Sequence, residues 1–435
     1  MKFRLRKPLA ILSCAAAGVI TLSACNFGST LLGKPQKVVP ASHGELIADE
    51  FVAFTQKEET FAAKLAACTY ENYDGGENFT VSPISVYTAL SLAAECAAGD
   101  TRDEILSAFS VTHTELKKNI STLYRSLAND VRDGLTLLDM TNSIWVDEST
   151  QVNKPCIDAL SNDYYCYSYS ANFKKDNAAA NGAVRRFVKD RTRGLIDKEY
   201  GLSDETAFAI INTLYLKDLW NLTGNDLPFT DEEYGFTNAD GSVTQTKLLT
   251  GYYNGGKVYE TDEYSAFYTK TLGSYKLKFI LPNDGYTVDE IFTAENIATV
   301  NGLTDYGNSA PESGTYYATR CFFPEFKCGY DGDLAGILKE KFGIERLFKN
   351  PANESDACDF STLTSSPAYC TAVYHTTELA VDKKGIEGAA GTIMPGGDGA
   401  PQPTEKYDFV IDRAFGFIIT DSRDITLFSG VVNKI

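Results

Sequence analysis

The sequence predicts an α+β fold, because helices dominate the first third of the chain and strands its second half. Apolar residues recur at helical spacing in four segments between residues 46 and 130. After residue 270, six further segments have the alternating or continuously apolar composition of strands. Since helices precede strands instead of alternating with them, this order favours an α+β protein over a parallel βαβ sheet.

The individual elements follow the chain in that order. Helices are expected at 46–68, 84–97, 101–110 and 115–130. Strands are expected at 136–147, 206–216, 275–281, 316–327, 371–382, 407–411, 415–420 and 425–433. The segment 206–216 is apolar enough to be buried on both faces. Residues 385–403 are the low-complexity stretch, rich in Gly, Ala and Pro, and by composition alone they would be a surface loop.

Composition narrows the class of protein. The chain has 435 residues, of which 43% are hydrophobic and 23% charged, as in a soluble globular protein with one large domain or two smaller ones. Its formal net charge of −18 would repel nucleic acid, so no nucleic-acid partner is expected. Three histidines leave little material for a His-rich metal site, and we expect neither a metal nor a cofactor.

The first 24 residues have the pattern of an export signal. Lys2, Arg4, Arg6 and Lys7 precede a mostly apolar stretch that ends in Leu22-Ser23-Ala24-Cys25. This ending resembles the bacterial lipobox, which implies lipidation of Cys25 and an exported protein held at the cell surface or shed from it. Removing residues 1–24 with their four positive charges takes the net charge from −18 to −22. The alternative is an ordinary signal peptide with a cysteine nearby.

Domain boundaries follow from this signal. Residues 25–45 contain Gly, Ser and Pro with little periodicity and predict a flexible tether after the lipidated cysteine. Residues 46–435 are expected to form the folded domain. Its eight cysteines contain no CxxC pair, and the sequence leaves free thiols and disulfides as open alternatives. Beyond residue 25 no apolar run is long enough to cross a bilayer.

A series of short motifs occurs in a fixed order through this domain. They are Asn78-Phe79-Thr80-Val81-Ser82-Pro83, Gly99-Asp100-Thr101-Arg102, Asn142-Ser143-Ile144-Trp145-Val146, Ile211-Asn212-Thr213-Leu214 with Trp220, Phe323-Pro324-Glu325-Phe326-Lys327, Phe342-Gly343-Ile344, Asp359-Phe360-Ser361, His375, Asp412-Arg413-Ala414-Phe415 and Phe428-Ser429-Gly430-Val431-Val432. In this order and spacing they resemble the serpin family, here in a bacterial, lipoprotein-type form. The resemblance covers residues 46–435.

The resemblance implies the serpin fold, with three β-sheets, about nine helices and an exposed reactive-centre loop near the C-terminus. In inhibitory members a serine protease cleaves this loop, is trapped as an acyl-enzyme, and is carried away as the cut loop inserts into the main sheet. Inserting roughly fifteen residues at about 3.3 Å each would move the protease by about 50 Å. The protein would then be a monomeric inhibitor and no enzyme. The sequence also lacks the G-x-S-x-G and H-E-x-x-H motifs of hydrolases.

The loop hinge has side chains small enough to insert. Its residues are Gly385, Ile386, Glu387, Gly388, Ala389, Ala390, Gly391 and Thr392. Alternation places Ile386 and Ala390 on one face and the charged Glu387 on the other. The family has a Thr-like residue at the position of Ile386 and alanines at two of the glycines. Pro395, further along, would cost one ladder hydrogen bond.

The reactive bond is expected at Gly399-Ala400 when residues are counted forward from the hinge. Counting back from Phe415 places it at Pro403-Thr404, which means that the loop is four residues longer than is usual in the family. Small residues around the bond, and the absence of Lys and Arg between 385 and 405, favour an elastase-like or subtilisin-like protease as partner.

The resemblance to the serpin family also assigns two further regions. Ser82, Ser85, Asn212 and His375 match the polar cluster beneath the main sheet, called the shutter in this family. Trp220 matches the tryptophan of the breach, where the loop enters the sheet. At the breach, Lys383 and Glu325 occupy positions with the opposite charges in the family pattern, so an ion pair of reversed sign is expected. The rival function is a non-inhibitory serpin that acts as a binding or scaffolding protein.

Overall fold

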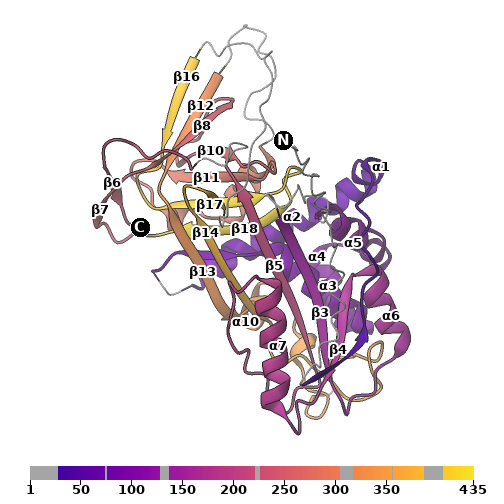
Figure 1. The fold of residues 1–435 in the computed structure, drawn as a ribbon. Helices are drawn as coiled ribbons and strands as arrows, with labels where there is room; N and C mark the ends of the chain where they lie inside the picture. Colours follow the sequence, from indigo (N-terminus) through magenta and orange to yellow (C-terminus); the bar gives the residue numbers. More distant parts are fainter. Residues whose placement is uncertain are drawn as a thin grey trace, which may run out of the picture.

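Three hydrogen-bonded sheets carry the fold (Figure 1). The computed structural model describes residues 28–73, 76–127, 137–220, 226–303, 317–354, 356–386 and 405–435. Within these ranges the main sheet has the order β1 (Ser29–Gly33), β4 (Cys166–Ala171), β3 (Leu137–Asp147), β5 (Phe208–Leu219), β15 (Gly385–Ile386), β14 (Tyr374–Val381) and β13 (Phe326–Asp333).

The second sheet continues from the first, because β13 pairs with β2 at Gly329 and Phe79. It has the order β2 (Phe79–Val81), β18 (Thr426–Val432), β17 (Phe415–Thr420), β11 (Lys276–Pro282), β10 (Tyr264–Lys270) and β9 (Tyr259–Glu260). The third sheet consists of β16 (Glu405–Val410), β12 (Tyr317–Phe323) and β8 (Leu249–Gly255). A ribbon of β6 (Tyr234–Thr237) and β7 (Val243–Thr246) completes the described strands.

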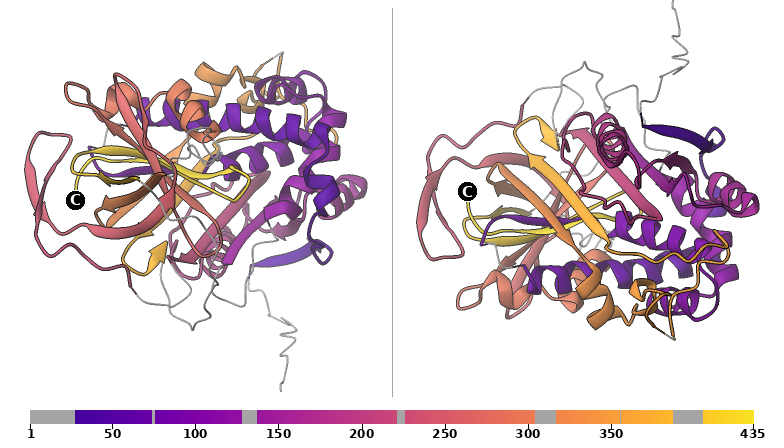
Figure 2. Two further views of the ribbon diagram at one scale, coloured as in Figure 1. Left: turned by 90° about the horizontal axis from the view of Figure 1, so that it is seen from above. Right: turned by 90° about the horizontal axis from the view of Figure 1, so that it is seen from below.

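Helices cover the sheets, as the two end-on views show (Figure 2). They are α1 (His43–Leu46), α2 (Asp49–Glu71), α3 (Pro83–Cys96), α4 (Gly99–Phe109), α5 (His113–Leu127), α6 (Lys154–Asp163), α7 (Asn177–Arg191), α8 (Val288–Ile291), α9 (Ala294–Gly302) and α10 (Ala335–Phe342). The α+β fold with three sheets is confirmed. Among the described ranges, no helix is both long and apolar enough to span a membrane.

The buried helix α3 forms the centre of the core. Almost all of its side chains are buried, in keeping with a sequence that is apolar on every side. It contacts β5 of the main sheet, β18 of the second sheet and the helices α2 and α4. Tyr87 of α3 stacks on Phe109 of α4, with ring centroids 4.0 Å apart. A helix in this position holds the two sheets and the helical layer together.

The predicted helices and strands are present with small shifts, but one predicted strand is interrupted and many elements lie where the sequence predicts none. The segment 316–327 is two strands, β12 and β13, because the turn at Pro324 and Glu325 interrupts it and proline has no N–H to donate. The elements that the sequence does not predict are α6, β4 and α7 between residues 148 and 205, β6 to β10 between residues 234 and 270, and the helices α8, α9 and α10. All eight cysteines of the described domain are free, and six are buried, so the free-thiol alternative holds in this structure.

The predicted tether is wrong in part. Residues 29–33 are not flexible but form β1, which pairs antiparallel with β4 through Ser29 and Ala171 at one end and Gly33 and Ser168 at the other. Backbone pairing to an open sheet edge needs no hydrophobic periodicity, so composition gave no signal of this strand. The short helix α1 follows within the same predicted tether and begins with a capping box between Ser42 and Glu45.

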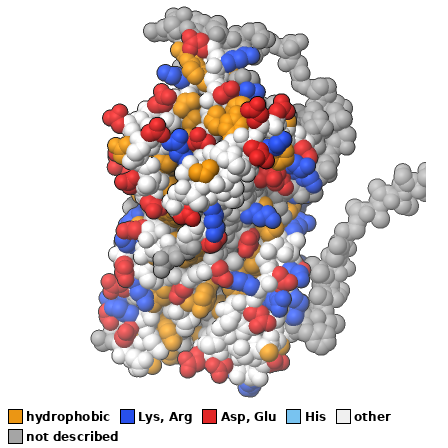
Figure 3. All heavy atoms as spheres, turned by 90° about the vertical axis from the view of Figure 1, so that its left-hand side faces the viewer, with side chains coloured by type: hydrophobic (Ala, Val, Ile, Leu, Met, Phe, Trp, Pro, Cys, Tyr) orange, Lys and Arg blue, Asp and Glu red, His pale blue; other side chains and the backbone are white. Residues whose placement is uncertain are grey.

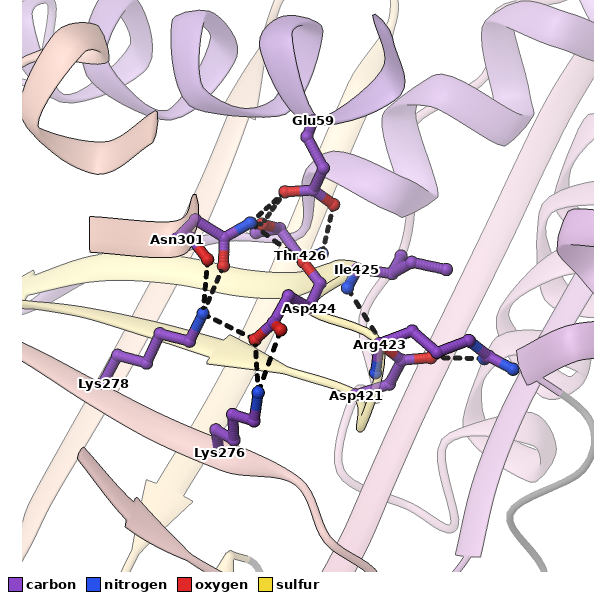
Figure 4. Close-up of polar contacts among 9 residues, drawn as sticks. All are labelled: Glu59, Lys276, Lys278, Asn301, Asp421, Arg423, Asp424, Ile425 and Thr426. Atoms are coloured by element: carbon purple, nitrogen blue, oxygen red, sulfur yellow. Dashed lines mark hydrogen bonds and ion pairs between the residues drawn. The ribbon is translucent and has the colours of Figure 1, made fainter. Parts of the chain in front are cut away.

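A buried polar network connects α2 and α9 to the second sheet (Figure 4). The ammonium group of Lys278 has no solvent exposure; it pairs with Asp424 at 2.7 Å and donates to the carbonyl and side-chain oxygens of Asn301 at 2.8 Å. Glu59 accepts hydrogen bonds from the backbone N–H and the hydroxyl of Thr426 at 2.8 and 2.7 Å. The neighbouring Glu58 is fully buried, and neither of its oxygens has a hydrogen-bond partner.

Burial favours the protonated form of both carboxyl groups. Burial raises the pKa of Glu59 to about 7, although its bonds from Thr426 act in the other direction. Burial and the charge of Glu59 raise the pKa of Glu58 well above its usual value, and Asp421 adds to this effect. The stability that these groups contribute is therefore fully present below their ordinary pKa of 4.5 and is lost as the pH rises through the raised pKa of each group, which for Glu59 is about 7.

We expect the Glu58→Gln variant to be stabilised relative to the wild type, and more so at pH 8 than at pH 5. The gain in the free energy of unfolding over the wild type should be larger at pH 8 than at pH 5 by about 1–3 kcal/mol, since one pKa unit corresponds to about 1.4 kcal/mol. Urea unfolding at both pH values measures it. Glu205→Gln, at an exposed position, controls for the loss of one negative charge. An equal change at pH 5 and pH 8 would contradict the assignment.

The surface shows no large region of one sign on the face drawn in Figure 3. Asp and Glu side chains are interspersed there with Lys and Arg, and apolar side chains are scattered between them. Numerous ion pairs connect such groups across the described surface, for example Arg320 with Asp408 and Arg185 with Asp197.

Candidate functional site

The first two hinge residues already form a strand of the main sheet. Gly385 and Ile386, as β15, pair with Leu219 and Asp218 of β5 on one side, and Ile386 pairs with Val381 of β14 on the other. Ile386 is completely buried. The remaining hinge residues 387–392 and the predicted reactive bond Gly399-Ala400 lie outside the described residues. The hinge therefore enters the sheet between β5 and β14.

Gly385 lies where only glycine fits. A Cβ atom at this position would be 1.9 Å from the carbonyl oxygen of Asp218, which is far inside van der Waals contact. Asp218 is itself fixed, since one carboxylate oxygen accepts the N–H of Gly273 at 2.7 Å and the other that of Leu219 at 2.9 Å. The close approach of the two backbones explains the glycine at the start of the hinge.

Beyond β15, the strands β5 and β14 are separated by a space that we call the seam. In the described part of the main sheet they are not hydrogen-bonded neighbours, because β15 lies between them and is only two residues long. A cavity of about 90 Å³ follows, lined by residues 209–214 of β5 and 374–378 of β14. Two facing strand edges that are not hydrogen-bonded to each other offer backbone N–H and C=O groups with which a further strand can pair.

All four predicted shutter residues line the seam. The backbone N–H of Ser82 donates to Nε2 of His375 at 3.0 Å, and the hydroxyl groups of Ser82 and Ser85 are 2.9 Å apart. Burial lowers the pKa of His375 to about 4. The ring is therefore neutral at pH 7 and, because Nε2 accepts a hydrogen bond, carries its proton on Nδ1.

Asn212 lies on the opposite strand of the seam and makes a separate set of contacts. Its amide donates to Asn142 of β3 at 2.7 Å and to Thr88 of α3 at 3.1 Å. Its carbonyl oxygen is buried without a hydrogen-bond partner. The seam thus has an unsatisfied acceptor on its β5 side and a neutral imidazole on its β14 side. A buried acceptor is costly to leave unpaired, so an inserted strand could offer a partner to the carbonyl oxygen of Asn212.

Trp220 holds the turn before the hinge, at the predicted breach. Its indole N–H donates to the carbonyl of Asp382 at 2.6 Å, its backbone N–H donates to the carbonyl of Lys384 at 3.3 Å, and its ring packs against Phe323. Asp382 closes the turn by accepting the N–H groups of Lys384 and Gly385 on its side chain. Trp220 therefore fixes the point where the chain turns into the sheet.

The predicted ion pair between Lys383 and Glu325 is wrong in its partner. The Lys383 ammonium group pairs with Asp226 at 2.9 Å, and both side chains are about two-fifths exposed. Glu325 accepts the backbone N–H of Lys383 instead, at 2.9 Å. The neighbouring strands β13 and β14 do bring Lys383 and Glu325 together. The ammonium group of Lys383, however, is directed toward Asp226. Exposed pairs of this kind add little to stability.

Sequence reasoning missed several residues that build the site. Asp218, Asp226, Asp382 and Thr88 were not singled out. Asp382, three residues before Gly385, has the Asp-x-x-Gly spacing of a turn, a signal present in the sequence. Asp218, Asp226 and Thr88 carry no such local pattern, because their roles depend on contacts with residues distant in the chain.

The hinge strand β15 therefore lies between β5 and β14 of the main sheet and leads toward the seam. The family model "Serpin (serine protease inhibitor)" matches residues 56–435. The chain therefore belongs to the serpin family.

Curated relatives match over most of their length. An alpha-1-antitrypsin-like protein of Tamias sibiricus is 23% identical over 431 residues, covering 98% of this chain and 96% of that protein. The corticosteroid-binding globulin of Ovis aries is 26% identical over 325 residues, covering 73% and 71%. By their names, the relatives thus include both antitrypsin-like proteins and a binding globulin.

Solved structures agree on the fold. The native state of Tengpin, a thermophilic serpin, has a TM-score of 0.73 at 21% identity, covering 94% of this chain and all of that one. The complex of thyroxine-binding globulin with thyroxine has a TM-score of 0.70 at 19% identity, covering 88% and 99%. The serpin fold predicted from the motifs is confirmed.

Proposed function

We propose that this serpin inhibits serine proteases by loop cleavage, acyl-enzyme trapping and insertion of the cut loop into the main sheet. The observation that carries the proposal is β15: two hinge residues already lie between β5 and β14, and the seam continues in the direction that the loop would take. Insertion would satisfy the open strand edges with new ladder hydrogen bonds, which supplies part of the driving force.

The sequence of the hinge supports insertion. From the buried Ile386, alternation places Gly388, Ala390 and Thr392 toward the core and the charged Glu387 away from it. Small side chains can enter a narrow slot without displacing its walls. We further propose cleavage at Gly399-Ala400 by an elastase-like or subtilisin-like protease, since small residues surround that bond.

The protein is also proposed to be an exported bacterial lipoprotein, held at the cell surface through Cys25 or shed into the extracellular space. The support is the Leu22–Cys25 sequence and the basic and apolar segments before it. The lipid would hold the chain at a membrane without a spanning segment.

The second candidate is a non-inhibitory serpin. Relatives named corticosteroid-binding globulin, and a related structure in complex with thyroxine, favour this alternative. The two candidates differ in whether the loop inserts after cleavage, so insertion is the property to measure.

Incubation with a panel of elastase-like and subtilisin-like proteases tests the proposal. We expect an SDS-stable complex with at least one protease. We also expect the release of a C-terminal peptide whose intact mass corresponds to residues 400–435. Cleavage in the loop by a non-target protease should raise the melting temperature strongly, because the new strand adds hydrogen bonds and buried area. If every protease cleaves the loop and turns over, and the melting temperature does not rise, the non-inhibitory candidate is correct.

A further inference from the structure

Three buried cysteines lie together where α3, α6 and β4 meet. Cys96 is the last residue of α3, Cys156 lies in the first turn of α6, and Cys166 is the first residue of β4. Cys96 and Cys166 have no exposed surface, and Cys156 is 3% exposed. All three belong to one hydrophobic core cluster, and α6 contacts both α3 and β4. The fold therefore gathers three thiols at one buried place.

Within this group, the thiols of Cys96 and Cys156 contact each other. The side-chain hydrogen bond with Cys156 is the largest cause that raises the pKa of Cys96 well above its usual value, and burial adds to it. The thiol of Cys166 is directed elsewhere, because its Sγ atom donates to the carbonyl of Tyr167 at 3.3 Å. Cys96 and Cys156 are therefore the two cysteines placed to form a bond with each other.

Contacts on both ends of α6 fix its position against the end of α3. Leu363 donates its N–H to the carbonyl of Cys96 at 3.1 Å and accepts the N–H of Asn153, which directly precedes α6, at 2.7 Å. The hydroxyl of Tyr164, which directly follows α6, donates to the carboxylate of Glu95 at 3.0 Å. Since both ends are held, the two thiols stay side by side in the folded chain, and this proximity favours a disulfide between them over separate oxidation.

We propose that Cys96 and Cys156 are a redox site, at which a disulfide oxidant such as glutathione disulfide joins α3 to α6 covalently in the folded chain. The structure shows the reduced form, with both thiols free. One cysteine attacks the oxidant, forms a mixed disulfide and releases one thiol. The other cysteine then attacks the protein sulfur of the mixed disulfide and releases the second thiol. One S–S bond forms in the protein, and the oxidant is reduced to two thiols that carry the two protons.

The bond would connect the core helix to one side of the main sheet. α3 contacts β5 and β18, while α6 contacts β4, which continues through β3 to β5. The bond would also close residues 96–156 into a loop, and closing a loop of this length restricts the unfolded chain strongly. An exported chain meets disulfide oxidants, and export is part of the proposed function. The pairing of the two thiols rests on neither export nor inhibition.

Treatment of the full-length protein with glutathione disulfide tests the pairing. It is carried out at the lowest urea concentration at which iodoacetamide alone modifies both cysteines, so that local opening makes the buried thiols reachable. The chain is then mapped by mass spectrometry without reduction. We expect a peptide pair linked through Cys96 and Cys156, and a whole-chain mass lower by two hydrogen atoms. Linkage of either cysteine to Cys166, or glutathione on both without a linked peptide, would overturn the pairing.

Three variants and the stability of the two forms complete the test. Cys96→Ser and Cys156→Ser should each abolish the linked peptide and leave the remaining cysteine as a mixed disulfide with glutathione. Cys358→Ser is the matched control and should leave the linked peptide unchanged, because Cys358 is also buried but its Sγ atom donates to the carbonyl of Ala368 at 2.9 Å. The oxidised wild type should melt about 3–5 °C above the reduced form. Equal melting temperatures would overturn the proposal that the folded chain accommodates the bond.

Discussion

The Ala390→Arg variant is expected to lose its SDS-stable protease complex and become a substrate. Strand alternation from the buried Ile386 directs residue 390 toward the core, so insertion would have to bury a guanidinium group. A desolvation cost of at least about 3 kcal/mol slows insertion by roughly a hundredfold, and the acyl-enzyme hydrolyses first. Complex yield and the rate of loop cleavage, measured on the same gels, test this.

Ala389→Arg provides the matched control. It adds the same charge one residue earlier, on the face that carries Glu387, so a clearly smaller loss of complex is expected. Equal losses in both variants would mean that the charge acts on protease recognition and not on insertion. A full yield of complex from Ala390→Arg would contradict the inserted orientation derived from β15.

The Gly385→Ala variant is expected to free the hinge from the main sheet. Its Cβ would lie 1.9 Å from the Asp218 carbonyl oxygen, and Asp218 is held in place through the N–H groups of Gly273 and Leu219. The native state should lose about 1–3 kcal/mol, as expected for overpacking in a tight site. Insertion of the cut loop should also begin less readily. We therefore expect both a lower yield of the protease complex and a lower free energy of unfolding than in the wild type.

Gly336→Ala is the matched control for this change. Gly336 is within α10, and a Cβ there would meet no atom within 4 Å. The substitution should leave complex formation unchanged and add up to about 1 kcal/mol, because alanine is the better helix former. If Gly385→Ala is as stable and as inhibitory as Gly336→Ala, the close backbone approach at the hinge is unimportant.

Local patterns predicted the elements whose stability depends on their own composition. The apolar periodicity of α2, α3, α4 and α5 and the continuous apolar runs of β5, β17 and β18 reflect burial, so their positions were predictable. The helices α6 to α10 and the strands β4 and β6 to β10 were not predicted. Their mixed composition acquires a preferred structure only against neighbours that are distant in the chain.

Some residues of the candidate site could also be predicted from the sequence, and others could not. Order and spacing of motifs identified Ser82, Ser85, Asn212, His375 and Trp220, and the structure places the first four around one seam and the fifth at its entrance. The partner of Lys383 could not be predicted. Whether its ammonium group meets Glu325 or Asp226 depends on the direction of a long side chain at a turn, which pairing positions do not determine.

The sequence by itself determined the order of helices and strands, the small and uncharged inward face of the hinge, and the family to which the chain belongs. These are properties of composition and spacing along the chain. Only the tertiary structure decided that β15 enters between β5 and β14, that Glu58 is buried without a partner, and that β1 pairs with β4. Each of these depends on backbone pairing or desolvation between segments far apart in sequence, and such contacts leave no local pattern.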